Sequence, residues 1–586
     1  MWLLSLISLQ VVTSFGEEPA IPFRSSLQIG PSSGGGQYRY YPERWNSVHV
    51  QLTNRLDREA VLLSTAYVGD DASMQYGRAQ WLPPQSTMDI AYPVWFPAPS
   101  PSQPTACDLH TQLLESDGKE ELLVRDTSGK LTSSDLLQLT PDKAPTGFIG
   151  PEFDPSQAVE RNAIQQLILS SRKLNLLPTM VHEMPNADLP TTPEALSQLD
   201  ELIIASDRVC HDEAAVAAIR QWLAAGGRLW ILLDQVEATT LEQLLGDRCD
   251  VAEIDRVELN SFTLSERAFN QTVSRDSGEY EQPVPFVRVD SPAADVEFRI
   301  NGWPAAFWLD YGAGRVLVTT LGARGWLPPQ RGQEPEAIPP AVALTGKFFG
   351  PKSRPESLPK ELPPVVEGYI GYTIPSQGLI VGLLGGFAVV LFLTIAALWF
   401  ARRLEWIGIV TPALAVAFGL LLILTGFRHQ HAVGATVGRL QIAESVPGGE
   451  ILRVRGITGL YVPEGRHVPL AGDEGGRFVP DMRGLEGMNR RLIWTDTGRW
   501  HWENLYQPGG LRLAEHTASV RLATPLAVDA TFDHDGVQGR LRHGLQTPLE
   551  DSVLLTSNGR AGARMNGEGQ FSTTAQDFLG PGQYLA

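Results

Sequence analysis

The chain has 586 residues, of which 43% are hydrophobic and 19% are charged, so it is neither a disordered chain nor a transporter built mostly of membrane-spanning helices. Its length suffices for three or four domains, and its formal net charge of −19 argues against nucleic acid as a partner, because phosphate backbones would repel it. The three cysteines, Cys107, Cys210 and Cys249, are too few for a disulfide scaffold. Cys210 and Cys249 fall in one predicted domain and could pair in an oxidising compartment; the alternative is three buried thiols.

Residues 1–16 are predicted to be a signal peptide. The apolar stretch from Trp2 to Val12 is too short to span a bilayer but has the length of a signal-peptide core. Ser14 and Gly16 are small residues two positions apart, which suits cleavage after Gly16. No Lys or Arg precedes the stretch, so either the amino terminus alone supplies the charge or the true start lies upstream.

Residues 25–145 are predicted to form an immunoglobulin-like β-sandwich. Val48, Val50 and Leu52 alternate with polar residues, which is the period of a half-buried strand. Further strands are expected at 61–68 and 88–96, between turns rich in Asp, Gly and Pro.

Residues 146–325 are predicted to form a flavodoxin-like α/β domain. Buried strands are expected at 201–205 and 229–233, with an amphipathic helix at 212–225 that Asp212 caps. Two continuous apolar strands around a helix indicate a parallel sheet. Near the end of this region a hairpin is expected, with strands at 307–310 and 315–320.

Three stretches of this region resemble class I glutamine amidotransferase-like domains. They read Leu-Asp-Glu-Leu-Ile-Ile at 199–204, Ala-Ile-Arg-Gln-Trp-Leu-Ala-Ala-Gly-Gly-Arg-Leu at 218–229, and Tyr-Gly-Ala-Gly-Arg-Val-Leu-Val at 311–318. The similarity covers about a third of the chain. A helix that ends in Gly-Gly before a buried strand is also common in flavodoxin-like folds generally.

The resemblance implies a degenerate domain. An active member of that family needs a cysteine nucleophile on a glycine-flanked turn and a histidine that activates it. Here the corresponding turn reads Asp234-Gln235-Val236-Glu237, and the segment after Thr320 contains no histidine. We therefore assign no catalytic residue, and no cofactor-binding or metal-binding residue either. Cys210-His211-Asp212-Glu213 is interpreted as a capped helix start, and Asp533-His534-Asp535-Gly536 as a hairpin turn.

The middle of the chain is predicted to address a membrane. Residues 328–376, with ten prolines between Pro328 and Pro364, are expected to be a semi-rigid linker. Two uncharged apolar runs follow, at 379–400 and 406–427, each about 33 Å long as a helix and so matched to about 30 Å of hydrocarbon. Arg402 and Arg403 lie between them, which places this loop in the cytoplasm, although Arg428 is a contrary signal.

Residues 433–586 are predicted to form a β-rich domain in which Trp494, Trp500 and Trp502 pack a sheet. The order of parts resembles that of uncharacterised bacterial membrane proteins, particularly those of planctomycetes. This resemblance implies an architecture and no chemistry.

The sequence thus predicts a non-catalytic, membrane-anchored binding or scaffold protein of the bacterial cell envelope. It would be a multi-pass protein of the inner (plasma) membrane with both soluble portions outside the cytoplasm, and its partners would be the lipid bilayer and other envelope proteins. One alternative is a hydrolase or amidotransferase-like enzyme with a relocated site around Cys210, His182 and Asp234. Another is a sensor that passes a signal across the two helices.

Overall fold

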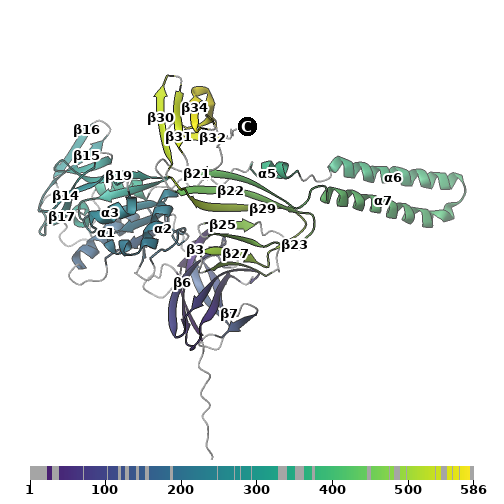
Figure 1. Cartoon of the computed structure of the whole chain (residues 1–586), viewed down its shortest axis with the longest axis horizontal. Coiled ribbons are helices and arrows are strands. Elements are labelled where there is room, and N and C mark those ends of the chain that lie inside the picture. The colour runs from purple at the N-terminus through teal and green to yellow at the C-terminus, as the bar shows by residue number, and fades with distance from the viewer. Residues whose placement is uncertain are drawn as a thin grey trace, which may run out of the picture.

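The computed structural model describes most of the chain, and its elements form a body of several sheets from which two long helices project (Figure 1). The described residues are 23–29, 39–69, 72–99, 101, 103–116, 120–125, 131–139, 144–151, 158–184, 189–193, 195–246, 249–268, 271–276, 279–291, 294–327, 339–349, 362–371, 376–444, 451–473, 476–480, 489–495, 498–524, 526–534, 536–542, 551–556, 559–566 and 568–580. The predicted signal peptide, 1–16, lies outside these residues.

Two facing sheets form a sandwich near the N-terminus. One consists of β1 (Phe23–Ile29), β3 (Arg44–Asn54) and β6 (Ser86–Phe96), with β3 in the middle. The other begins with β2 (Arg39–Tyr40), β9 (Thr132–Leu139), β7 (Ala106–Ser116), β4 (Ala60–Val68) and β5 (Met74–Leu82), with β8 (Glu121–Val124) beside β7. Val48, Val50 and Leu52 of β3 are buried in the core between the sheets, as their alternation predicts.

The second of these sheets continues with strands from the far end of the chain. β5 pairs in parallel with β26 (Arg490–Thr495), followed by β27 (Arg499–Glu503) and β24 (Leu470–Asp473). We call this the shared sheet. Trp494, Trp500 and Trp502 pack a sheet as expected, but that sheet belongs to the sandwich and not to a separate C-terminal β-rich unit. The large aromatic surfaces need a core, and β26 covers the edge that β5 would otherwise expose.

The rest of the C-terminal region forms smaller sheets. One is ordered β21 (Thr436–Glu444), β22 (Ile451–Val462), β29 (Gly510–Arg521) and β25 (Arg477–Pro480). A short ribbon pairs β23 (Arg466–His467) with β28 (Tyr506–Gln507). The last sheet is ordered β30 (Ala527–Asp533), β31 (Gly536–Arg542), β34 (Gln570–Thr574), β33 (Gly559–Met565) and β32 (Asp551–Thr556), with β35 (Phe578–Leu579) beside β33.

A mixed sheet, which we call the α/β sheet, occupies the region predicted to be α/β. Its parallel strands are ordered β11 (His182–Glu183), β10 (Thr146–Ile149), β12 (Glu201–Ile204), β13 (Arg228–Leu232) and β20 (Gly314–Thr319). Antiparallel strands follow: β19 (Trp303–Tyr311), β18 (Asp295–Ile300), β15 (Thr263–Ala268) and β16 (Gln271–Asp276). A separate ribbon joins β14 (Ala252–Leu259) and β17 (Val284–Asp290).

The local predictions for this region are confirmed. β12 and β13 pair in parallel, and α2 (Glu213–Ala224) connects them. The Asp212 carboxylate accepts hydrogen bonds from the Ala214 and Ala215 N–H groups, so it caps the helix. β19 and β20 form the expected hairpin.

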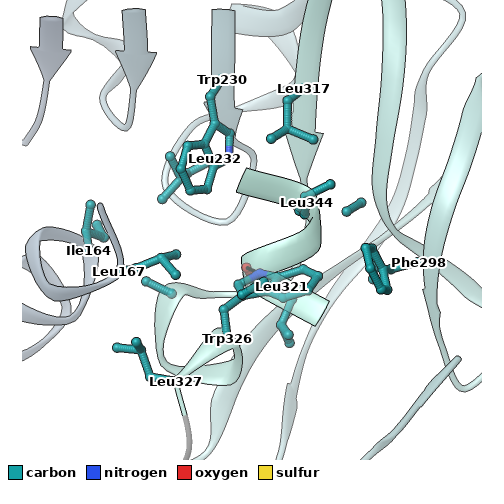
Figure 2. Close-up of a cluster of buried hydrophobic side chains, with 14 of the residues drawn as sticks. Ile164, Leu167, Trp230, Leu232, Phe298, Leu317, Leu321, Trp326, Leu327 and Leu344 are labelled. Atoms are coloured by element: carbon teal, nitrogen blue, oxygen red, sulfur yellow. Dashed lines mark hydrogen bonds between the residues drawn. The ribbon is translucent and has the colours of Figure 1, made fainter. Parts of the chain in front are cut away.

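Helices cover both faces of the α/β sheet. α1 (Ala158–Leu174) and α4 (Pro339–Phe348) pack on one face, and α2 and α3 (Ala238–Leu245) pack on the other. Figure 2 shows the first face, where Trp230, Leu232 and Leu317 of the sheet lie near Ile164, Leu167, Trp326 and Leu344. Successive side chains of each strand enter opposite cores, because the side chains of a strand alternate in direction.

The predicted linker at 328–376 is a packed part of the body wherever the structure describes it. Phe348 of α4 is fully buried against the α/β sheet, and Val366 of α5 (Leu362–Ile370) is 2% exposed against β21 and β22. The expectation of an extended spacer is therefore wrong for 339–349 and 362–371. Pro339, Pro340, Pro363 and Pro364 lie in first helical turns, where a proline costs no internal hydrogen bond.

The two predicted apolar runs form a pair of helices, α6 (Gln377–Phe400) and α7 (Ile407–Gln430). Both are long and apolar enough to cross a membrane, and neither is buried by the body. They run side by side away from the sheets (Figure 1), with the rings of Phe387 and Phe418 5.3 Å apart. We refer to α6, α7 and the loop between them as the hairpin.

Candidate functional site

The carboxyl edge of the α/β sheet is where ligands usually meet a parallel sheet. The turn after β13 holds Asp234, the position to which the resemblance noted in the sequence assigns the nucleophile. Asp234 Oδ2 accepts a hydrogen bond of 2.5 Å from Gln235 Nε2, whereas Oδ1 is enclosed without a partner among the described residues. Burial, together with the charge of nearby Glu160, raises the pKa of Asp234 to about 7.

Arg256 lies near this carboxyl group, but among the described residues it bonds to the neighbouring backbone and not to the carboxylate. Arg256 donates to the backbone oxygens of Val236 (2.7 Å) and Asp234 (3.5 Å). Glu160, in the first turn of α1, accepts a 2.9 Å bond from Arg324 Nε, while its Oε1 atom is enclosed and has no partner in the described part of the chain. Asp234 therefore places a carboxyl group at this edge and no thiol.

Cys210, the thiol candidate, lies on the short helix η3 (Asp207–His211). It is half-buried, and its Sγ atom is 4.0 Å from the Thr240 carbonyl oxygen. Burial, with a smaller contribution from the Asp207 charge, raises the pKa of the Cys210 thiol. The thiol therefore stays protonated near neutral pH. Cys107, Cys210 and Cys249 are all free in the structure.

His182 is not brought to this edge. It belongs to β11, which β10 and β12 separate from β13, so three strand spacings of about 4.8 Å, or about 14 Å, lie between them. Burial and neighbouring His49 lower the pKa of His182 to about 4. The combination of Cys210, His182 and Asp234 predicted as an alternative site is therefore not assembled.

The amino edge of the same sheet holds a buried polar cluster that the sequence analysis did not identify. Glu201, 1% exposed, accepts a 2.9 Å bond from Thr146 Oγ1, and burial raises its pKa to about 8. Arg172, 0% exposed, donates to Thr146 and to the carbonyl oxygens of Ala144 and Pro178. Arg228 Nη1 is 3.9 Å from Glu201 and donates to the Phe348 carbonyl oxygen at 2.8 Å, which ties the end of α4 to the sheet. The sequence signal that could have identified this cluster was Glu201, a glutamate at the start of an apolar strand.

A cleft of about 320 Å³ lies where three parts of the chain meet. The sandwich, a loop before β12 and strand β26 line it: Ser47, Arg78, Gln80, Met88, Asp89, Ile90, Ala91, Tyr92, Pro93, Thr191, Thr192, Ala195 and Trp494. Its volume falls at the lower end of the range for small-molecule sites. Hydroxyl, amide and guanidinium groups on its walls suit a small polar ligand better than an apolar one.

Side-chain hydrogen bonds join the main sheets of the body. Asp200 lies directly before β12. Arg44 of the sandwich donates to both of its carboxylate oxygens, at 3.0 and 3.1 Å. Arg453 of β22 donates to the Ala225 carbonyl oxygen at the end of α2, at 3.1 Å. The sandwich, the α/β sheet and the sheet of β21 and β22 are thereby joined.

Comparison with known proteins gives similarity to solved structures alone. No protein-family model matches the chain, and no curated protein matches it. A ThuA-like protein from Bacteroides uniformis is 10% identical over 36% of this chain and 91% of its own, with a TM-score of 0.26. A ThuA-like protein from Parabacteroides merdae is 12% identical over 38% of this chain and 94% of its own, with a TM-score of 0.26. A cytoplasmic protein from Salmonella typhimurium LT2 is 20% identical over 36% of this chain and 84% of its own, with a TM-score of 0.22. ThuA-like proteins have a glutamine amidotransferase-like fold, but TM-scores of this size carry no argument about this chain.

Proposed function

We propose that this chain is a non-catalytic binding or scaffold protein of the bacterial cell envelope, anchored in the inner membrane by the hairpin. Both soluble portions would lie outside the cytoplasm. The observation that carries the proposal is the pairing of β5 with β26, because these strands lie on opposite sides of the hairpin in the sequence.

The pairing restricts how the chain can cross a bilayer. Six residue pairs join the two strands, from Met74 with Arg490 to Ala79 with Thr495, and Trp494 is buried in the sandwich core. Strands that share backbone hydrogen bonds must lie on the same side of a membrane. A hairpin that crosses twice meets this requirement, whereas a single crossing between β5 and β26 would not.

The charge of the hairpin tip supports the choice of side. Arg402 and Arg403 are exposed at the turn, and the positive-inside rule favours the cytoplasm for them. Trp399, Phe400 and Trp406 are 62%, 78% and 48% exposed near the same turn, which is typical of aromatic residues at a membrane interface. The body would then lie outside the cytoplasm.

The non-catalytic part of the proposal rests on the carboxyl edge. Asp234 replaces a nucleophile there, and the Cys210 thiol has a raised pKa and no imidazole bonded to it among the described residues. The enzyme alternative would need a different set of groups. The sensor alternative would need a cytoplasmic output, and only the short turn around Arg402 and Arg403 would face that side.

Reporter fusions test the topology. Alkaline phosphatase fused after Ala586 should be active, because that end would be exported. The matched fusion after Arg403 should be inactive, because it would lie in the cytoplasm. The opposite pattern would contradict the proposed orientation, and activity at both sites would contradict the hairpin.

Purification from solubilised membranes tests the binding role. We expect tagged full-length protein to co-elute with a stoichiometric envelope protein, and the isolated hairpin (376–431) with the same tag not to do so. Glutamine hydrolysis by the purified chain, together with the absence of any specific partner, would favour the enzyme alternative.

A further inference from the structure

We propose that α5 lies in the headgroup layer of the membrane and that Val365 and Tyr369 contact lipid there. This inference rests on the proposed membrane anchoring and adds a second attachment surface to it. Its basis is the way in which α5 and both ends of the hairpin are held on one sheet.

The inner face of α5 is fixed on β21 and β22. Leu362, Val366 and Ile370 are 8%, 2% and 4% exposed and pack with Ile457 and Tyr461. The sheet admits this close approach because Gly438 and Gly459 are paired across the two strands. A Cβ atom at Gly459 would lie 2.6 Å from Ile370 and 2.7 Å from Val366, and one at Gly438 would lie 2.9 Å from Ile370. α5 is therefore packed closely against the sheet and is not a mobile tether.

The end of α7 is held on the same sheet. Tyr461, which is fully buried beside α5, donates through its hydroxyl to the Gln430 carbonyl oxygen. The Gln430 side chain donates to the Pro463 carbonyl oxygen, and His431 Nε2 lies 3.6 Å from Glu464. These contacts fix where the hairpin leaves the body, and they place that point next to α5.

The first helix of the hairpin starts close to α5 as well. Six residues separate Ile370 from Gln377, a span of at most about 25 Å. Figure 1 shows α5 between the β21 and β22 strands and the start of α6, at the base of the hairpin. If the hairpin spans the bilayer, α5 lies beside the membrane surface.

The exposed side of α5 has the chemistry of a membrane interface. Val365 and Tyr369 are 56% and 82% exposed and lie one turn apart on one side of the helix. Glu367 projects from a different side, so the stripe itself carries no charge. Tyrosine is favoured where an apolar ring meets lipid and a hydroxyl meets water. Tyr369 would provide at this end of the hairpin what Trp399 and Trp406 provide at the other.

Site-specific labelling tests the proposal on the full chain. In a background with Cys107, Cys210 and Cys249 replaced by alanine, single cysteines are introduced by Tyr369→Cys and Val365→Cys and labelled with a polarity-sensitive fluorophore. The protein is reconstituted in phosphatidylcholine vesicles with or without lipids that carry a quencher near the headgroup. We expect a blue-shifted emission at both positions and a loss of emission when the quencher is present.

Two control positions separate the possible failures. Phe392→Cys, 72% exposed on α6, should report a lipid environment. Leu176→Cys, 94% exposed after α1, should report water, because the α/β part lies on the opposite side of the body from the hairpin (Figure 1). Water-like signals at 365 and 369 with a lipid signal at 392 would overturn the role of α5 and leave the anchoring intact. A water-like signal at 392 would overturn the anchoring, and with it this inference.

Discussion

The shared sheet and the α/β sheet are assembled from the chain in opposite ways. Among the described residues each has nine strands. The α/β sheet takes all of its strands from one continuous segment, from Thr146 to Thr319. The shared sheet takes strands from 39–139 and from 470–503, with the α/β sheet and the hairpin between them in the sequence.

This difference has a consequence for folding. Met74 pairs with Arg490, which is 416 positions later (490 − 74 = 416). Contacts between such distant residues form only after a large loss of chain entropy, so they form slowly and late. The α/β sheet can complete itself before the hairpin is made, whereas the sandwich core is incomplete until Trp494, Trp500 and Trp502 arrive. Local stability should therefore respond to different substitutions in the two sheets.

The largest effect is expected for Trp494→Ala. The side chain is 4% exposed in the sandwich core, and its removal should cost about 3–5 kcal/mol. Hydrogen exchange should show lost protection in β5 and β26 with little change in β12 and β13. Trp81→Ala is the control, since Trp81 is 43% exposed and its removal should cost much less. Equal loss in both sheets would show that they unfold as one unit.

A smaller effect, limited to the α/β sheet, is expected for Asp234→Asn. The folded pKa of about 7 lies above the ordinary value, so the native state binds this proton more tightly than the unfolded state does. The protonated Asp234 carboxyl group therefore favours the folded state. This contribution to the free energy of unfolding is fully present below about pH 4 and is lost as the pH rises through 7. Asn removes the loss, so at pH 8 the variant should be more stable than the wild type by about 1–3 kcal/mol, with the difference shrinking toward pH 4.

Denaturant unfolding at a series of pH values measures this difference. Glu160→Gln should shift the loss to lower pH, because the charge of Glu160 helps to raise the pKa of Asp234. A pH dependence that Asp234→Asn leaves unchanged would show that this carboxyl group is not the one responsible.

The ion pair between the sandwich and the α/β sheet should contribute less to the free energy of unfolding. Arg44 and Asp200 form a two-bond ion pair whose side chains are 26% and 13% exposed. A double-mutant cycle with Arg44→Ala and Asp200→Ala should give a coupling of about 1 kcal/mol, which falls at high salt because the pair is partly exposed. A coupling near zero would show that the sandwich and the α/β sheet are joined by other contacts.

The smallest effect is expected for Cys210→Ala. The thiol is half-buried, and among the described residues its hydrogen-bond contact is the long one to Thr240, so stability should change by about 1 kcal/mol or less. We expect no glutaminase activity before or after the substitution. Measurable glutamine turnover that Cys210→Ala abolishes would contradict the non-catalytic proposal.

The sequence by itself predicted what depends on neighbouring residues. The continuous apolar strands β12 and β13, the helix between them and its cap at Asp212 follow from hydrophobic periodicity and from a side chain that bonds two residues ahead. The helices α6 and α7 follow from long runs without charge. In each case the residues that decide the structure are adjacent in the chain.

Tertiary structure alone decided the rest, because the deciding partners lie far apart in the sequence. The aromatic residues Trp494, Trp500 and Trp502 indicated a sheet but not which one, since β5 lies more than 400 positions away. Prolines at 339–340 and 363–364 suggested a spacer, although the helices that they begin are held by the α/β sheet and by Gly438 and Gly459. The pKa of Asp234 is raised by burial and by Glu160, and no pattern around residue 234 contains either cause.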